Sequence, residues 1–271
     1  EQIRGEGDAE RNRVFADAFN RDPDFFAFYR SMQAYEGGLR HSDTRMVLKP
    51  LRATVAVLDL TIDGLDERLH GFVGNVADRD SVDAAITAIA DALGGIDIVI
   101  NNAGISAIGT VEETADAEWA RVLDINVTGM ARVTAAALPW LRRSEHAAVV
   151  NLASIAALNG LPQRALYSAS KGAVLSLTFA MATDHIADGV RVNAVSPGTV
   201  FTPFVEKFLT QFEDPVKERA ALDARQATGR MVTPEEVAGA IAYLASPASG
   251  STTGTVLDVD GGLTHLRVRK S

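Results

Sequence analysis

The sequence predicts an α/β protein built on a doubly wound parallel sheet. From residue 53 onward, short runs rich in Val and Ile alternate with longer segments of helical periodicity. Continuous apolar runs of this length are typical of strands that are covered on both faces, as they are in parallel sheets. Alternation of such strands with helices places them in one sheet with helices on its two sides.

The individual elements follow from the same pattern. Strands are expected at 54–59, 71–75, 97–101, 147–152, 190–195 and 255–259. Helices are expected at 79–93, 115–142, 166–187 and 234–245, where apolar residues recur at a spacing of three or four.

Residues 1–42 differ in composition from the rest of the chain, because they are charged and rich in aromatic residues. Apolar residues at helical spacing predict two amphipathic helices, with a break at Asp22-Pro23 and a stop at Gly37-Gly38. We therefore divide the chain into a helical N-terminal segment, 1–50, and an α/β domain, 51–271.

Composition limits the possible partners. The 271 residues carry a formal net charge of −9, which makes nucleic acid or an anionic membrane an unfavourable partner. No apolar run approaches the ~18 residues of a membrane span, and no signal peptide is evident. We expect a cytoplasmic protein. The chain has no cysteine, and its five histidines are scattered, so no metal site is expected.

Polar motifs stand at or near the ends of the predicted elements, where open α/β sheets bind their ligands. They are "NNAG" at 101–104, Asn126, Ser154, "YSASK" with Tyr167 and Lys171, and "SPGTVFTP" at 196–203. Each alone has an ordinary structural interpretation: a helix irregularity for Asn126, a cap for Ser154, and a solvated i,i+4 pair for Tyr167 and Lys171. Their joint order and spacing favour a functional site.

The chemistry of these side chains fits one reaction type. A tyrosine titrates near ~10 in water, and a lysine one helical turn away favours the phenolate. Tyr167 can then act as a general acid and base toward a hydroxyl or carbonyl oxygen, while Ser154 hydrogen-bonds the same oxygen. Asn126, at a helix distortion, could hold a water that links Lys171 to solvent. Proton exchange at a carbonyl oxygen pairs with hydride transfer at carbon, which requires a cofactor.

With these motifs, residues ~53–263 resemble the short-chain dehydrogenase/reductase family. The resemblance implies a Rossmann-type sheet, an NAD cofactor, and a homo-tetramer or dimer formed through the helices at 115–142 and 166–187. It makes Asn126, Ser154, Tyr167 and Lys171 the catalytic residues. The cofactor residues that it implies are Asp59, Asn75, Val76, Asn102, Ala103, Gly104, Tyr167, Lys171, Pro197, Gly198, Val200 and Thr202.

Asp59 and two arginines bear on specificity. By the resemblance, Asp59 at a strand end accepts from both adenosine ribose hydroxyls and repels a 2′-phosphate, which favours NAD over NADP; the alternative is a helix cap. The segment 214–246 resembles cytosolic-type (R)-3-hydroxybutyrate and 2-keto-3-deoxy-L-fuconate dehydrogenases. Arg164 and Arg225 are therefore expected, with Ser154 and Tyr167, to bind a substrate carboxylate; the alternative is that both are surface arginines in salt bridges.

The beginning of the domain departs from the family pattern of strand, glycine-rich loop and helix. No convincing glycine loop precedes Asp59. Residues 45–48, "RMVL", can form a strand, but too few residues join it to 54–59 for a parallel neighbour. Residues 1–50 instead resemble the C-terminal region of stomatin/prohibitin-like membrane-protease modulators. The sequence thus predicts a chimera whose dehydrogenase domain is N-terminally incomplete. The alternative to an active NAD-dependent enzyme is an impaired, dehydrogenase-like binding or structural subunit.

Overall fold

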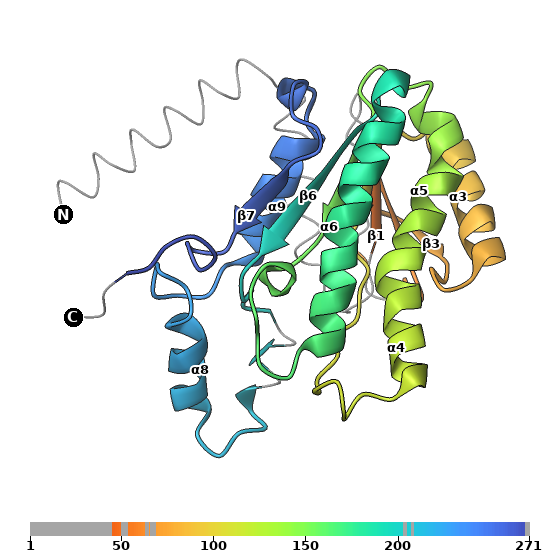
Figure 1. Cartoon of the computed structure of the whole chain (residues 1–271). Coiled ribbons are helices and arrows are strands. Elements are labelled where there is room, and N and C mark those ends of the chain that lie inside the picture. The colour runs from red at the N-terminus through yellow and green to blue at the C-terminus, as the bar shows by residue number, and fades with distance from the viewer. Residues whose placement is uncertain are drawn as a thin grey trace.

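The chain forms a seven-stranded sheet flanked by helices, in the order β3-β2-β1-β4-β5-β6-β7 (Figure 1). The computed structural model describes residues 45–49, 54–62, 65, 69–202, 205–206 and 209–268. The two helices expected in residues 1–42 lie outside this part. The strands are β1 (Arg45–Lys49), β2 (Thr54–Asp59), β3 (Leu69–Val73), β4 (Ile98–Asn101), β5 (Ala148–Leu152), β6 (Arg191–Pro197) and β7 (Val256–Val259).

The centre of the sheet differs from the prediction. β1 lies between β2 and β4 and pairs antiparallel with both, whereas the other neighbouring strands pair in parallel. The prediction of a parallel sheet is therefore wrong at this position, whereas residues 45–48 form a strand that is not a parallel neighbour of 54–59, as their short connection predicts. The connection explains the direction, because residues 50–53 are too few for a parallel crossover but are enough for a hairpin.

Helices cover both faces, as a doubly wound sheet requires. They are α3 (Arg79–Leu93), α4 (Asp116–Leu123), α5 (Gly129–Leu141), α6 (Ala165–His185), α8 (Pro215–Asp223) and α9 (Pro234–Ala245). α3, α5 and α6 pack on one face, while α9 packs on the other, against β5, β6 and β7. The sequence did not predict α8. None of the described helices is long and apolar enough to cross a membrane.

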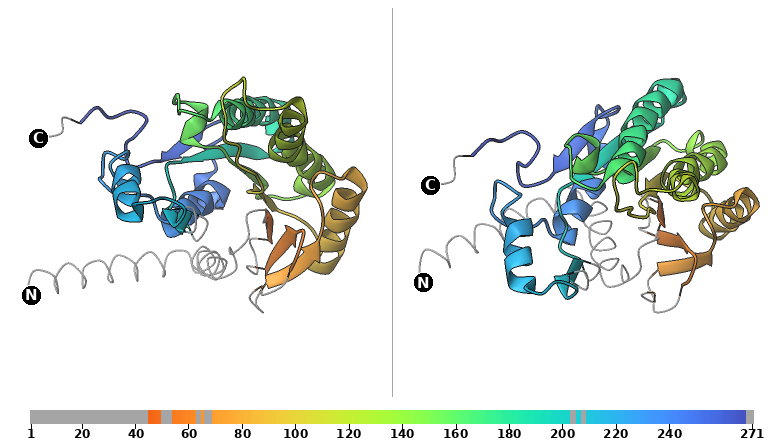
Figure 2. Two further views of the ribbon diagram at one scale, coloured as in Figure 1. Left: turned by 90° about the horizontal axis from the view of Figure 1, so that it is seen from below. Right: turned by 60° about the horizontal axis from the view of Figure 1, so that its bottom comes forward.

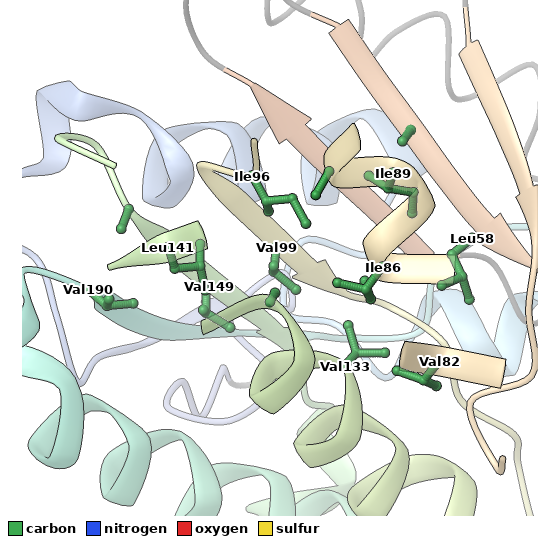
Figure 3. Close-up of a cluster of buried hydrophobic side chains, with 14 of the residues drawn as sticks. Leu58, Val82, Ile86, Ile89, Ile96, Val99, Val133, Leu141, Val149 and Val190 are labelled. Carbon is green, nitrogen blue, oxygen red and sulfur yellow. The ribbon is translucent and has the colours of Figure 1, made fainter. Parts of the chain in front are cut away.

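Alternation along the strands divides the core into two layers. Leu58, Val99 and Val149 face α3 and α5, with Ile86 and Val133 packed against them (Figure 3). Their sequence neighbours belong to the layer on the α9 face. Each interior strand therefore buries residues on both sides, which is why its sequence is a continuous apolar run.

The expected helix at 115–142 is interrupted. A π-helical turn, Asp124–Thr128, separates α4 from α5 and contains Asn126. π-turns inside α-helices are often found at functional sites. The helix irregularity proposed for Asn126 is thus present, and it sets the position of that side chain.

The start of α9 is fixed by a capping box and an ion pair. Thr233 and Glu236 cap each other's backbone N–H groups, and Arg230 forms two hydrogen bonds with the Glu236 carboxylate, at 2.6 and 3.0 Å. The hydrogen bonds from Arg230, and then from the Thr233 backbone, lower the pKa of Glu236 from 4.5 to about 2.

Replacing Glu236 with glutamine should therefore destabilise the fold in a pH-dependent way. Because the folded-state pKa is depressed, the contribution is present above pH ~4.5 and is lost as the pH falls toward ~2. The Glu236 side chain is 39% exposed, so solvent screening reduces the contribution to about 1 kcal/mol. Urea unfolding should show this loss at pH 7 and a narrowing difference below pH 4.5, with Glu235→Gln as the control. An equal loss at every pH would contradict the ionic explanation.

Candidate functional site

The carboxyl ends of β2, β3, β4, β5 and β6 lie at one edge of the sheet, because β2 and β4 both run opposite to β1 and the remaining pairs are parallel. The predicted site residues follow these ends in turn. Asp59 ends β2, Asn102 to Gly104 follow β4, and Ser154 follows β5. This edge is where open α/β sheets bind ligands.

α6 places Tyr167 and Lys171 at this edge. Tyr167 lies in the first turn of the helix and Lys171 one turn later, with its side chain buried. The Lys171 Nζ donates to the Leu152 carbonyl at 2.7 Å and lies 5.8 Å from the centre of the Tyr167 ring. Lys171 thus anchors α6 to the end of β5, so the pair is not a solvated surface pair.

The pKa of Tyr167 is set by one influence that raises it and two that lower it. Burial raises the pKa of Tyr167, while a hydrogen bond with Ser154 and the charge of Arg164 lower it, and the net direction is upward. Burial therefore outweighs the groups that lower the pKa of this phenol. The neutral phenol is the favoured form of the folded chain at neutral pH.

Ser154 caps a short helix and also lies beside Tyr167. Its hydroxyl accepts a hydrogen bond from the Ala156 backbone at 3.2 Å and caps the short 3-10 helix Ile155–Ala157. The same side chain lies close enough to Tyr167 to lower the pKa of the phenol. The cap fixes the hydroxyl beside the phenol.

Asn126 organises the loop that follows β4. Its Oδ1 accepts from the Ile105 backbone N–H at 2.7 Å, and its Nδ2 donates to the Ile105 carbonyl at 2.9 Å and to Ser170 Oγ at 3.1 Å. The fully buried side chain thus joins the "NNAG" loop to α6. Ser170 also donates to the Tyr167 carbonyl at 2.8 Å.

Arg164 holds the next part of the same loop. Its Nη1 donates to Ser106 Oγ at 2.9 Å and to the Ala107 carbonyl at 3.0 Å. The residue before it, Gln163, has a left-handed φ of 55°, and its carbonyl accepts from the Gly109 N–H at 3.0 Å. A non-glycine residue in this conformation is strained and is usually held by its surroundings. The guanidinium is thereby fixed near Tyr167.

Arg164 and Arg225 are two cations that influence each other. Neither makes an ion pair with another residue in the part of the chain that the structure describes, so the alternative of two surface salt bridges finds no support there. Burial lowers the pKa of Arg164, Tyr167 raises it and Arg225 lowers it. Two mutually repelling guanidinium groups near a phenol form an environment that favours an anion.

The described residues fit the nicotinamide end of the expected cofactor. Gly104 lies against the site: a Cβ at this position would be 3.2 Å from Asn126 Oδ1 and 3.5 Å from Lys171 Nζ. A side chain there would fill the space beside these two groups. Gly198 is as restricted, since its Cβ would be 3.0 Å from the Asp260 Cα.

The other expected cofactor residues lie along the same edge. Asp59 is buried and accepts from the Leu60 N–H at 2.6 Å. Asn75 is exposed, while the Val76 side chain packs in the core. Asn102 and Ala103 start the loop after β4, and Pro197 ends β6. Val200 pairs with Val232, and the Thr202 hydroxyl accepts from the Val205 N–H at 3.3 Å.

The pyrophosphate position lacks its usual protein partner among the described residues. In the expected arrangement a central strand ends at the ligand edge, and a helix begins directly after it. Here Lys49, at the end of β1, pairs with Thr54 at the start of β2, so β1 ends at the opposite edge. A helix that follows β1 cannot point its first N–H groups at the ligand edge.

Sequence reasoning missed Ser170 and the backbone contacts of residues 105–109. Ser170 lies between Tyr167 and Lys171 in "YSASK", and its i,i+3 relation to Tyr167 was a usable signal for a side chain that faces the same core. The contacts of the loop are made by backbone carbonyl and N–H groups. Because these groups do not depend on residue type, the sequence gives no signal for such contacts.

Known proteins are similar to this chain in sequence and in fold. Residues 51–264 match the family described as enoyl-(acyl carrier protein) reductase. The chain is 37% identical over 225 residues to 2-(S)-hydroxypropyl-CoM dehydrogenase 3 of Xanthobacter autotrophicus, covering 79% of this chain and 88% of the relative. It is 40% identical over 197 residues to the inactive 2-(S)-hydroxypropyl-CoM dehydrogenase 2 of the same organism, covering 72% and 85%. The ligand-free aldohexose dehydrogenase of Thermoplasma acidophilum superposes with a TM-score of 0.74 at 33% identity, covering 79% and 85%.

Proposed function

Because this chain belongs to the short-chain dehydrogenase/reductase family of NAD(P)-dependent oxidoreductases that act on alcohols and ketones, we propose that it transfers hydride between NAD(H) and the secondary alcohol or ketone of a small hydroxy or sugar acid. One observation carries the proposal. The Ser154 hydroxyl lies close enough to Tyr167 to lower the pKa of the phenol, and Lys171 anchors the helix of Tyr167 to the strand that leads to Ser154.

The side chains divide the proton chemistry between them. The Tyr167 hydroxyl gives its proton to the carbonyl oxygen during reduction and takes it back during oxidation. Ser154 donates a hydrogen bond to the same oxygen and orients it. Lys171 holds the helix of Tyr167 and places a positive charge near the phenol. Bound NAD(H) supplies or accepts the hydride.

The preference for NAD over NADP rests on Asp59. This carboxylate lies at the end of β2 and is held by the Leu60 N–H. A carboxylate at this position attracts ribose hydroxyls and repels a 2′-phosphate. Comparing kcat/KM with the two cofactors tests the preference, and equal values would contradict it. Asp59→Asn should narrow the difference in kcat/KM between NAD and NADP.

The substrate carboxylate is assigned to Arg164 and Arg225. The support is that both guanidinium groups lack an ion pair in the described residues and that Arg164 lies near Tyr167. The resemblance to (R)-3-hydroxybutyrate and 2-keto-3-deoxy-L-fuconate dehydrogenases makes those acids the first substrates to try. NADH oxidation should be followed by absorbance with a keto acid and with its methyl ester. The acid should have the higher kcat/KM, and equal values would argue against the arginine assignment.

The pH profile of Arg164→Gln gives an independent prediction. The Arg164 charge lowers the pKa of Tyr167, so its removal should raise that pKa further. Ketone reduction uses the neutral phenol, so the alkaline limb of its rate should move to higher pH. Alcohol oxidation uses the phenolate and should need a higher pH than in the parent. Arg143→Gln, an exposed change of equal charge, is the control and should leave both limbs in place.

The direction of β1 favours a second candidate, a chain that binds NAD(H) weakly and acts as a binding or structural subunit. Loss of the helix start removes hydrogen bonds to the pyrophosphate worth roughly 1.5–3 kcal/mol each. Losing two weakens binding by about two to four decades. The name of the second Xanthobacter relative records an inactive protein of similar sequence. Calorimetric titration with NADH separates the candidates: micromolar binding supports the enzyme, and no binding at millimolar NADH supports the subunit.

We further propose a homo-dimer or homo-tetramer that uses the outer surfaces of α5 and α6. Phe179 on α6 is 45% exposed, and Ile186, directly after α6, is 52% exposed, which suits a surface that is covered in an assembly. Sedimentation of the full chain tests this. We also propose that residues 1–50 form a separate segment similar to stomatin/prohibitin-like proteins, because the match to the dehydrogenase/reductase family begins at residue 51.

A further inference from the structure

Two turns at the ligand edge come from distant parts of the chain. The first turn follows β3, spans residues 74–78 and holds the proposed cofactor residues Asn75 and Val76. The second is the π-turn, Asp124–Thr128, which holds Asn126. α3 begins directly after the first turn and α5 directly after the π-turn. The two helices pack against each other and lie side by side in both views of Figure 2.

Arg132, near the start of α5, joins the two turns. Its Nη1 donates to the Val76 carbonyl at 3.1 Å, and its Nη2 lies 2.7 Å from Asp124 Oδ1. The Arg132 side chain is 17% exposed, so these contacts are largely shielded from water. A planar guanidinium can donate to two acceptors at once in a fixed geometry. This side chain therefore fixes the distance between the turn after β3 and the π-turn.

The rest of the turn after β3 is tied to β2 and α3. The Gly74 N–H donates to the Asp59 carbonyl at 2.8 Å. The Asn75 N–H donates to Ser81 Oγ, and the Asn75 Oδ1 accepts from the Ala77 N–H, both at 2.9 Å. These hydrogen bonds shape the turn and join it to its neighbours along the chain. The guanidinium adds the connection to the π-turn.

The π-turn extends this connection to the proposed nicotinamide end of the site. Asn126 accepts from the Ile105 N–H at 2.7 Å and donates to Ser170 Oγ at 3.1 Å. The connected groups thus run from the turn after β3, through Arg132 and the π-turn, to the loop after β4 and to α6. One side chain links the two proposed ends of the dinucleotide site.

We propose that Arg132 is a positioning residue that sets the turn after β3 and the π-turn at the separation at which one NAD(H) molecule contacts both. It acts through Val76 and Asp124. Order that exists before binding raises affinity, because less of it has to be created when the ligand binds. The inference rests on the proposed function for its ligand, whereas the order imposed on residues 74–78 belongs to the free protein.

Arg132→Met removes both polar contacts and retains an apolar stem. The KM for NADH, and its Kd from calorimetry, should rise about tenfold, as the loss of a hydrogen bond to a charged group implies. The kcat at saturating NADH should be unchanged, because the lost interaction is the same in the ground state and the transition state. A purely structural role would lower the urea midpoint without raising the Kd for NADH, and that result would overturn the inference.

Two further variants test the connection itself. Arg132→Lys keeps the charge but loses the planar fork, so its Kd for NADH should lie between those of the parent and of Arg132→Met. Adding Asp124→Asn to Arg132→Met should raise the Kd no further, because the effects of residues in one ion pair are not additive. A fully additive increase would contradict a shared connection.

Arg142→Met is the matched control. Arg142 follows directly after α5, and its side chain is 49% exposed and lies 2.8 Å from Asp188. This ion pair lies at the other end of α5 from the π-turn, toward the edge at which β5 begins. Its loss should leave the KM and the Kd for NADH unchanged.

Amide hydrogen exchange of the free protein separates this inference from the proposed function. The N–H groups of Ala77 and Asp78 both donate to Asn75 within the turn after β3. In Arg132→Met they should exchange about tenfold faster, because the turn loses a charge-assisted contact and opens locally more often. Unchanged exchange would overturn the inference, whether or not the parent binds NADH. Faster exchange in a chain whose parent does not bind millimolar NADH would support the role of Arg132 and contradict the proposed function.

Discussion

Tyr167→Phe is expected to lower kcat by about 10²–10⁴-fold, the usual contribution of a positioned general acid or base. The substitution removes only the hydroxyl, whose pKa Ser154 and Arg164 influence. The ring, its distance from Lys171 and the Lys171 anchor on the Leu152 carbonyl are retained. Steady-state NADH oxidation should therefore collapse, while NADH affinity measured by calorimetry should change little.

The matched control for this result is Tyr243→Phe. Tyr243 lies on α9 and is 48% exposed, so loss of its hydroxyl should leave kcat unchanged. Full activity in Tyr167→Phe would exclude Tyr167 as the proton donor. Loss of NADH binding together with activity would instead assign the tyrosine to holding the cofactor.

Arg191→Met is expected to produce the largest loss of stability, about 3–5 kcal/mol, because several buried carbonyls lose their donor and each buried acceptor left unsatisfied costs about 1–3 kcal/mol. Arg191 starts β6 and is 8% exposed. Its guanidinium donates to the Leu244 and Ala245 carbonyls at the end of α9, and to Ser246, Ser249 and Thr252. The last carbonyls of a helix have no partner within the helix.

Urea unfolding should show the difference as a lower midpoint with a similar slope. The urea midpoint of Arg191→Lys should lie between those of the parent and of Arg191→Met, because an ammonium has three donors and cannot replace the planar guanidinium group. Arg143→Met at an exposed position should be near neutral. A loss below 1 kcal/mol for Arg191→Met would mean that water replaces the guanidinium at these carbonyls.

The predictable part of the fold is the part where pattern and packing agree. The strands at 54–59 and 147–152 and the helix at 79–93 are found within about one residue of their predicted ends, because apolar periodicity reports burial directly. The strand expected at 71–75 begins earlier, at Leu69. Gly71 and Gly74 give weak strand propensity, whereas pairing with β2 decides its limits.

The sequence pointed to candidate site residues that the structure brings to one edge of the sheet, but it did not predict the interactions among them. The order of Asn126, Ser154, Tyr167 and Lys171 indicated the chemistry, and the structure places their helices and strands together. The direction of the Tyr167 pKa depends on burial, which motif spacing does not report. The role of Arg164 in fixing the loop depends on the strained turn at Gln163, for which the sequence has no glycine to indicate a left-handed residue.

The β1–β2 hairpin changes the order in which this sheet can assemble. Parallel neighbours must wait for a long crossover to close, which makes them slow steps in folding. β1 and β2 are separated only by residues 50–53, and hairpins form in about 1–10 μs. The middle of the sheet therefore has its own local nucleus. β4 to β7 can then add to one side of a template that is already formed, and β3 to the other.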